Sequence, residues 1–267
     1  MKAESTGRKI WRVIYPVIAL FVLYFGVVYL SMMIISSSSC GGAGNLDDSM
    51  NGYFAIVTSV ALVIIIIVEY IFFRNDFVTQ SKDNIKKPAY LAALVILGAA
   101  LSHGLNLLIS LFNINGIFDS YEAVNNEIFA PGIVFVIIRT LILAPIAEEL
   151  VFRGLVFRRM KEYTSFWPSA IVSAALFGLY HMNLAQGIFA FLFGLVLAAM
   201  YDRYQNLLAP VLMHFAANLL SVILEYTKAS YPSVAVYIIS MIVMFALSAA
   251  IIVFVFKKIP KPQSEIC

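Results

Sequence analysis

The chain has 267 residues, of which 62% are hydrophobic and 12% are charged, and its formal net charge is +3. About a quarter of the residues in a soluble domain are charged, so this composition excludes an ordinary water-soluble fold. The two cysteines, Cys40 and Cys267, are too few and too distant in sequence to indicate a disulfide scaffold or a metal knuckle. The sequence therefore predicts an integral membrane protein in contact with the lipid bilayer.

Eight apolar runs approach or exceed the ~20 residues that a helix needs to cross a bilayer. In chain order they cover residues 13–36, 52–73, 89–112, 131–156, 166–182, 186–202, 207–225 and 234–256. The fifth and sixth runs are short and closely joined, so we expect a helical hairpin that stops below the outer surface. The predicted fold is all-α, a polytopic membrane helical bundle of about eight transmembrane helices, with residues 1–267 as a single membrane domain.

The charged residues indicate how these spans are oriented. If the N-terminus is cytoplasmic, all Lys and Arg residues except Arg139 and Lys228 fall on the cytoplasmic side. The outer loops then hold the acidic residues Asp47, Asp48, Asp119, Glu122, Glu127 and Glu225. This asymmetry follows the positive-inside rule and predicts a multi-pass protein of the plasma membrane with both termini in the cytoplasm. No basic–aromatic pattern indicates nucleic-acid binding.

Arg139 is a basic residue inside the fourth run. We expect it to reach the outer interface or to pair with an acid such as Glu127; the alternative is that it lines a functional site. The first reading is favoured because Glu148 lies nine residues further on, roughly on the opposite face of a regular helix.

The fourth run also contains two adjacent glutamates, Glu148 and Glu149. Carboxylates inside a membrane span are costly and persist mainly where they do chemistry or carry ions. Glu149 and Arg153 have the i, i+4 spacing of a helical ion pair. Glu148 is rotated by ~100° around the helix and is free to face another element, where it could act as a general base. Pro145 removes a backbone hydrogen bond and is expected to loosen the helix here.

Two later runs each add a histidine, His181 and His214. If the fourth and fifth runs form a hairpin, Glu148 and His181 lie at a similar height in the bundle. His214 and Asn218 share one helix face, and both can donate hydrogen bonds to an oxyanion. Phe177 lies one turn before His181, where it can pack against the imidazole or form part of a substrate wall.

Three motifs in this part of the chain resemble those of the CAAX protease and bacteriocin-processing (CPBP, or abortive-infection) family of intramembrane proteases. The run E-E-L-V-F-R at 148–153 is similar to the family's E-E-x-x-x-R, F-G-L-Y-H at 177–181 to its F-x-x-x-H, and H-F-A-A-N at 214–218 to its H-x-x-x-N. Because their order, spacing and membrane setting agree, we expect residues 130–225 to hold a CPBP-type catalytic core.

The resemblance implies peptide-bond hydrolysis within the membrane. It implies that Glu148 and His181 activate water, that His214 and Asn218 form the oxyanion hole, and that Glu149 and Arg153 support the site. The family has also been described as metalloproteases, which would make Glu148, His181 and His214 zinc ligands. A mechanism that requires no cofactor is favoured slightly, because Asn218 suits an oxyanion donor better than a zinc ligand and H-E-x-x-H is absent.

The predicted function is therefore an intramembrane endopeptidase that acts on a hydrophobic or lipidated, CAAX-like peptide or protein tail. The alternative is a non-enzymatic immunity or scaffold protein that uses its polar cavity to bind a bacteriocin or a membrane partner. An ion-coupled transporter would also explain buried carboxylates, but the sequence has no internal repeat of the kind found in many transporters.

Overall fold

A computed structural model describes residues 5–38, 46–74, 84–112, 132–228 and 230–260. This part of the chain forms eight helical segments and a short 3₁₀ turn, Asn84–Lys86. The segments are α1 (Thr6–Ser38), α2 (Leu46–Phe73), α3 (Pro88–Leu111), a continuous helix from α5 to α7 (133–161), α8 (Phe166–Tyr180), α9 (Leu184–Tyr204), α10 (Leu208–Thr227) and α11 (Val234–Lys258). The predicted all-α polytopic bundle is confirmed.

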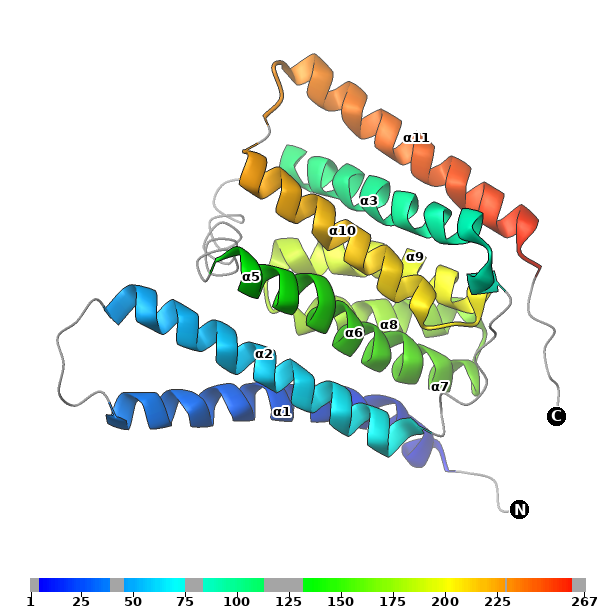
Figure 1. Cartoon of the computed structure of the whole chain (residues 1–267). Helices are drawn as coiled ribbons and strands as arrows, with labels where there is room; N and C mark the ends of the chain where they lie inside the picture. The colour runs from blue at the N-terminus through cyan, green and yellow to red at the C-terminus, as the bar shows by residue number, and fades with distance from the viewer. Residues whose placement is uncertain (1–4, 39–45, 75–83, 113–131, 229, 261–267) are drawn as a thin grey trace.

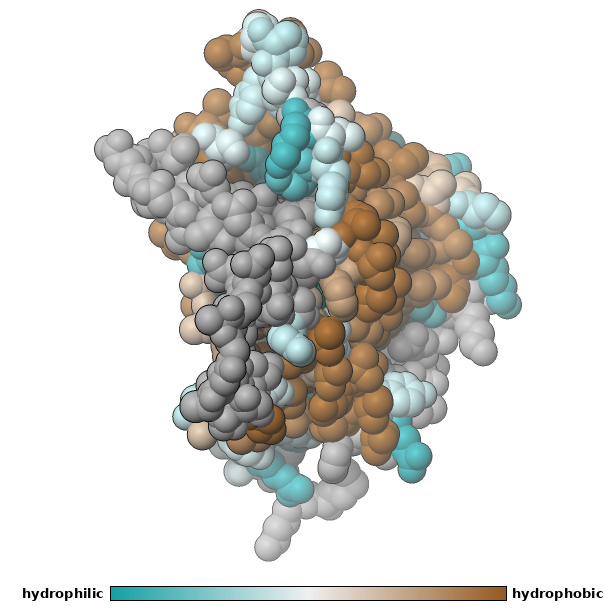
Figure 2. Space-filling model, turned by 60° about the vertical axis from the view of Figure 1, so that its left-hand side comes forward, coloured by the Kyte–Doolittle hydropathy of each residue, from teal (hydrophilic) through white to brown (hydrophobic). Residues whose placement is uncertain are grey.

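Six of these helices are long and apolar enough to span a membrane: α1, α2, α3, α9, α10 and α11. The remaining two segments are the continuous fourth helix and the 15-residue α8. Large hydrophobic side chains are exposed on the outward faces of the bundle, among them Ile239, Ile242 and Val243 of α11. Figure 2 shows hydrophobic surface over much of the coloured side in view. Such an apolar surface is stable in contact with lipid rather than water. The chain is therefore a multi-pass membrane protein.

The helices run roughly parallel and antiparallel to one another (Figure 1). The pair α1 and α2 covers one side of the fourth helix, α8 and α9 form a hairpin, and α3 packs between α10 and α11. We call one end of the bundle the α7 end; there α7 and α11 end and α1, α8 and α10 begin. At the opposite, α5 end, α5 begins and α3 and α10 end.

Glycines allow the closest helix contacts, as is common where helices associate in membranes. A Cβ atom added to Gly98 of α3 would lie 2.1 Å from the carbonyl oxygen of Met213 in α10. In the hairpin, a Cβ atom on Gly178 would lie 2.7 Å from the carbonyl oxygen of Gly187. These contacts fix the two helices that carry the histidines against their neighbours.

The fourth helix changes its hydrogen-bond register along its length. It consists of α5 (Ile133–Val136), a π-helical segment η3 (Ile137–Leu143), α6 (Ala144–Glu149), a second π-helical segment η4 (Leu150–Phe157) and α7 (Arg158–Lys161). The backbone N–H of Ala144 donates to the carbonyl of Arg139, five residues earlier. The next donor in that register would be Pro145, which has no N–H, so the carbonyl of Thr140 needs a partner from outside the helix.

Candidate functional site

The ion pair expected from the spacing of Glu149 and Arg153 is present. Nη1 of Arg153 donates to Oε1 of Glu149 at 2.8 Å, and both side chains are fully buried. The guanidinium also lies over the ring of Phe177, 4.5 Å from its centroid. A Cβ atom on Gly194 would lie 2.8 Å from Nη2 of Arg153, so any larger residue here would require the buried guanidinium to shift. No pattern in the sequence had related Gly194 to Arg153.

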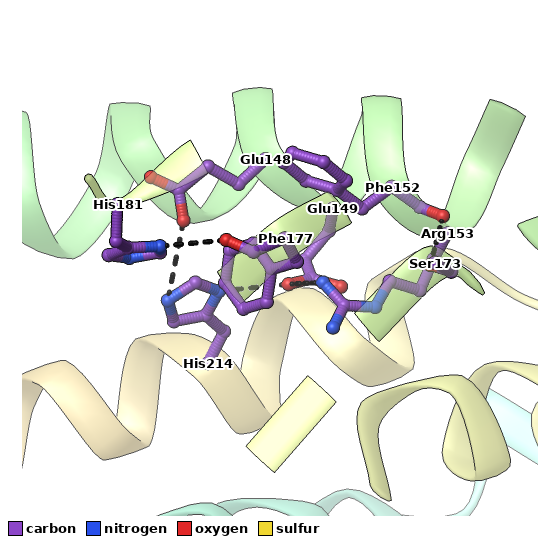
Figure 3. Close-up of polar contacts among 8 residues, drawn as sticks. All are labelled: Glu148, Glu149, Phe152, Arg153, Ser173, Phe177, His181 and His214. Atoms are coloured by element: carbon purple, nitrogen blue, oxygen red, sulfur yellow. Dashed lines mark hydrogen bonds and ion pairs between the residues drawn. The ribbon is translucent and has the colours of Figure 1, made fainter. Parts of the chain in front are cut away.

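His214 of α10 connects the two glutamates (Figure 3). Its Nδ1 is 2.9 Å from Oε1 of Glu149, and its Nε2 is 3.8 Å from Oε2 of Glu148. A carboxylate oxygen accepts, so Nδ1 is the donor in the shorter contact. The sequence had indicated His214 as an oxyanion donor or, alternatively, a zinc ligand, and did not indicate its contact with Glu149, because spacing within one helix says nothing about contacts with another.

His181 caps the C-terminus of α8, and its Nδ1 is 2.9 Å from the carbonyl oxygen of Phe177. The carbonyl can only accept, so Nδ1 carries the proton and Nε2 of the neutral ring keeps its lone pair. The ring of Phe177 packs edge-on against the imidazole with a centroid distance of 4.9 Å, as one of its expected roles requires. Among the contacts of the described residues, no hydrogen bond joins His181 directly to Glu148; the two face a common space (Figure 3).

Asn218 lies one turn beyond His214 and supplies the missing partner for the fourth helix. Its Nδ2 donates to the carbonyl oxygen of Thr140 at 2.8 Å. One of the two amide hydrogens is therefore committed to the backbone, and the other remains for a second acceptor. Sequence reasoning missed Thr140, although Pro145 marked the place where a carbonyl would lose its helical donor.

A cavity of about 570 Å³ brings these residues together. Its lining includes all four residues that were expected to be catalytic: Glu148, His181, His214 and Asn218. Aromatic side chains form much of the remaining wall, among them Phe177, Tyr180, Phe189 and Phe193. A concave site with apolar walls and a few convergent polar groups is the usual form of a ligand-binding or catalytic pocket.

Arg139 also lines this cavity, which was the less favoured of its two expected placements. Its Nη1 lies 3.4 Å from Oγ1 of Thr58 in α2, and its expected partner Glu127 lies outside the described residues. Each residue of a π-helical segment turns the chain by less than the ~100° of an α-helix, since the hydrogen bonds span five residues. Counting nine regular α-helical residues from Arg139 to Glu148 therefore gave the wrong face.

The residues expected as alternative zinc ligands share the cavity but do not form a metal cluster in this arrangement. No three His, Cys, Asp or Glu side chains in the described ranges lie close enough together to hold a metal ion. Nδ1 of His214 and Nδ1 of His181 already have protein partners, Glu149 and the carbonyl of Phe177. The geometry therefore defines a carboxylate, two imidazoles and an amide around one space.

Comparisons with known proteins agree with these motifs. The model of a family described as "Type II CAAX prenyl endopeptidase Rce1-like" matches residues 130–220. The "Putative membrane peptidase YdiL" of Bacillus subtilis (strain 168) is 22% identical over 223 residues, which are 82% of this chain and 89% of that protein. The "UPF0177 protein YbdI" of Lactococcus lactis subsp. lactis (strain IL1403) is 30% identical over 169 residues, 61% of this chain and 91% of that protein.

An "Uncharacterized 24.3 kDa protein" of Escherichia coli is 32% identical over 98 residues, which are 35% of this chain and 45% of that protein. No solved structure matches the chain significantly. The region matched by the family model contains the diglutamate, both cavity histidines and Asn218. The chain belongs to the CPBP family.

Proposed function

We propose that this protein is an intramembrane endopeptidase that hydrolyses a peptide bond in a hydrophobic or lipidated, CAAX-like peptide or protein tail. The observation that carries the proposal is the convergence of Glu148, His181, His214 and Asn218 on one cavity among membrane helices. Family membership supports the reaction class. The aromatic walls of the cavity support an apolar substrate.

In the proposed reaction, Glu148 is the general base. A water molecule between its carboxylate and Nε2 of His181 gives a proton to Glu148, and the water oxygen attacks the carbonyl carbon of the substrate. The lone pair on Nε2 of His181 accepts a hydrogen bond from the same water, since Nδ1 holds the proton in its bond to Phe177. Glu148 then returns the proton to the leaving amine nitrogen as the C–N bond breaks. The water oxygen remains in the new carboxylate of one product, and the transferred proton is on the new amine of the other.

The negative charge on the carbonyl oxygen is stabilised by donors on α10. The second N–H of Asn218 can donate to this oxygen while the first remains on Thr140. His214 donates from Nε2 only as an imidazolium, with Nδ1 donating to Glu149. The buried pair of Glu149 and Arg153 positions His214, because Oε1 of Glu149 accepts from Nδ1 of the imidazole.

We further propose that the reaction requires no cofactor and that the protein is in the plasma membrane with both termini in the cytoplasm. The basic residues at the α7 end support this orientation through the positive-inside rule. The partner is a peptide substrate within or at the bilayer, and not a nucleic acid.

The proposal can be tested with detergent-purified protein and a panel of quenched fluorogenic, CAAX-type peptides in H₂¹⁸O. Hydrolysis places one heavy oxygen in the new carboxylate of a product, which mass spectrometry detects and which also identifies the cleaved bond. The His181→Ala variant should lose this activity while it keeps its expression and folding. Retained cleavage in His181→Ala contradicts the role of the imidazole, and failure of the wild type to cut any peptide favours the immunity or scaffold alternative.

A further inference from the structure

The cavity extends from the glutamates toward only one end of the bundle. Among its described lining residues, those nearest the α7 end are Glu148 on α6, Phe177 on α8, Phe193 on α9 and His214 on α10. The lining then continues toward the α5 end, where it reaches Arg139, Ser110 and Val222. The glutamate and histidine thus form the floor of the cavity, and its mouth lies toward the α5 end.

On the other side of this floor, several large side chains in the described part of the chain are buried. Phe152 and Arg153 of the fourth helix are fully buried, and so is Tyr204 at the end of α9. Phe157 is 1% exposed. These buried side chains lie beneath the floor, and none of the described residues that line the cavity lies closer to the α7 end than the floor.

The short hairpin explains why a hollow exists at the α5 end. At ~1.5 Å per residue, the 15 residues of α8 cover about 22 Å, whereas the hydrocarbon core of a bilayer is about 30 Å thick. Since α8 begins at the α7 end, it is too short to reach the far side of the hydrocarbon core, and Met182 in the turn that follows both lines the cavity and is 75% exposed. The neighbouring α3 and α10 continue past the hairpin toward the α5 end, and their side chains line the cavity there.

The charge distribution assigns a side of the membrane to each end. The α7 end carries most of the described basic residues, among them Arg158, Arg159, Lys161, Arg203, Lys257 and Lys258, whereas Arg139 and Lys228 lie toward the α5 end. Basic residues beside membrane spans are retained on the cytoplasmic side. The closed end of the site is then cytoplasmic, and the mouth faces the extracytoplasmic side.

We infer that the cavity receives its substrate from the extracytoplasmic side of the membrane, and that this substrate is a hydrophobic peptide segment exposed at the outer leaflet. The inference rests on the proposed peptidase function for the fate of the peptide, but the direction of access follows from the cavity and the charges alone. Within the proposed substrate class, it favours hydrophobic or lipidated segments of exported or membrane-inserted peptides that reach the outer leaflet.

Cysteine labelling in intact cells tests the direction of access. In a full-length protein with Cys40→Ser and Cys267→Ser, Met182→Cys places one thiol at the mouth, and Lys257→Cys places one on the exposed surface of the α7 end. A membrane-impermeant maleimide is applied to intact cells, to permeabilised cells and to detergent-solubilised protein, and the labelled fraction is read as a gel shift.

We expect Met182→Cys to react in intact cells to nearly the same extent as in detergent, and Lys257→Cys to react only after permeabilisation. The inference is overturned if Met182→Cys reacts only after permeabilisation, only in detergent, or equally with Lys257→Cys in intact cells. Adding Glu148→Gln to the Met182→Cys protein separates the two proposals. If cleavage survives Glu148→Gln, the proposed peptidase mechanism is refuted, but the labelling result still stands. If Lys257→Cys and not Met182→Cys is labelled in intact cells, and Glu148→Gln abolishes cleavage, only the proposed side of access is refuted.

Discussion

Replacement of Arg153 by methionine should destabilise the protein strongly. The change leaves the carboxylate of Glu149 fully buried without the guanidinium that now lies 2.8 Å away. Removal of one partner from a buried ion pair typically costs about 3–5 kcal/mol, because the remaining charge is uncompensated. His214 still contacts Glu149 at 2.9 Å, so we expect a value in the lower half of this range.

The loss can be measured as a shift in thermal unfolding of the purified protein in detergent, followed by intrinsic fluorescence. For a chain of this size, each kcal/mol shifts Tm by roughly 2–4 °C, so a loss of about 3–4 kcal/mol in Arg153→Met should lower Tm by about 6–16 °C. Arg158→Met is a matched control on the same helix, because Arg158 is only partly buried at the interface and should change stability by less than about 1 kcal/mol.

A double-mutant cycle separates the ion pair from general packing effects. The double variant Glu149→Gln, Arg153→Met removes both charges and should be less destabilised than the sum of the single variants by about 0.5–3 kcal/mol. Purely additive effects, or a loss in Arg153→Met no larger than that in Arg158→Met, would refute the buried pair as a source of stability.

Three further predictions follow from the site. Gly194→Ala should impair cleavage, because the added Cβ atom would lie 2.8 Å from Nη2 of Arg153. Gly104→Ala is the control and should be tolerated, because the nearest atom to its added Cβ would be 3.4 Å away. Equal activities in the two variants would argue against this packing. Asn218→Ala should lower kcat about 10²–10³-fold through loss of an oxyanion donor, and it should also lower Tm because the carbonyl of Thr140 loses its partner. A change in Tm alone would assign Asn218 a structural role only. Zinc chelators should leave peptide cleavage unchanged, and loss on chelation that added metal restores would replace the proposed mechanism with a metal-dependent one.

The helices could be predicted because lipid leaves few choices for the backbone. An apolar run inside a bilayer must satisfy its own N–H and C=O groups, and a helix does so within one segment. The run 89–112 thus corresponds closely to α3 at Pro88–Leu111. The contact between Glu149 and Arg153 was also predictable, because both residues lie on one helix four positions apart.

The contacts between helices could not be predicted in the same way. They depend on how each helix is rotated about its axis, and the π-helical segments change that rotation without a distinct sequence pattern. For this reason Arg139 lies in the cavity and the carbonyl of Thr140 is available to Asn218. The link from His214 to both glutamates has the same origin, since it joins residues 65 positions apart.

A comparison of two glutamate-to-glutamine variants tests whether Glu148 activates the attacking water. Glu148 lines the cavity, whereas Glu69 is a fully buried glutamate of α2 that is not among the described lining residues. Both substitutions remove one carboxylate from a membrane helix and keep its shape, so they have comparable effects on the fold. Peptide cleavage by the two purified proteins is measured beside the wild type. We expect Glu148→Gln to lower kcat about 10²–10⁴-fold and Glu69→Gln to retain activity close to that of the wild type. Cleavage by Glu148→Gln at the wild-type rate would contradict the assignment of Glu148 as the base that activates water.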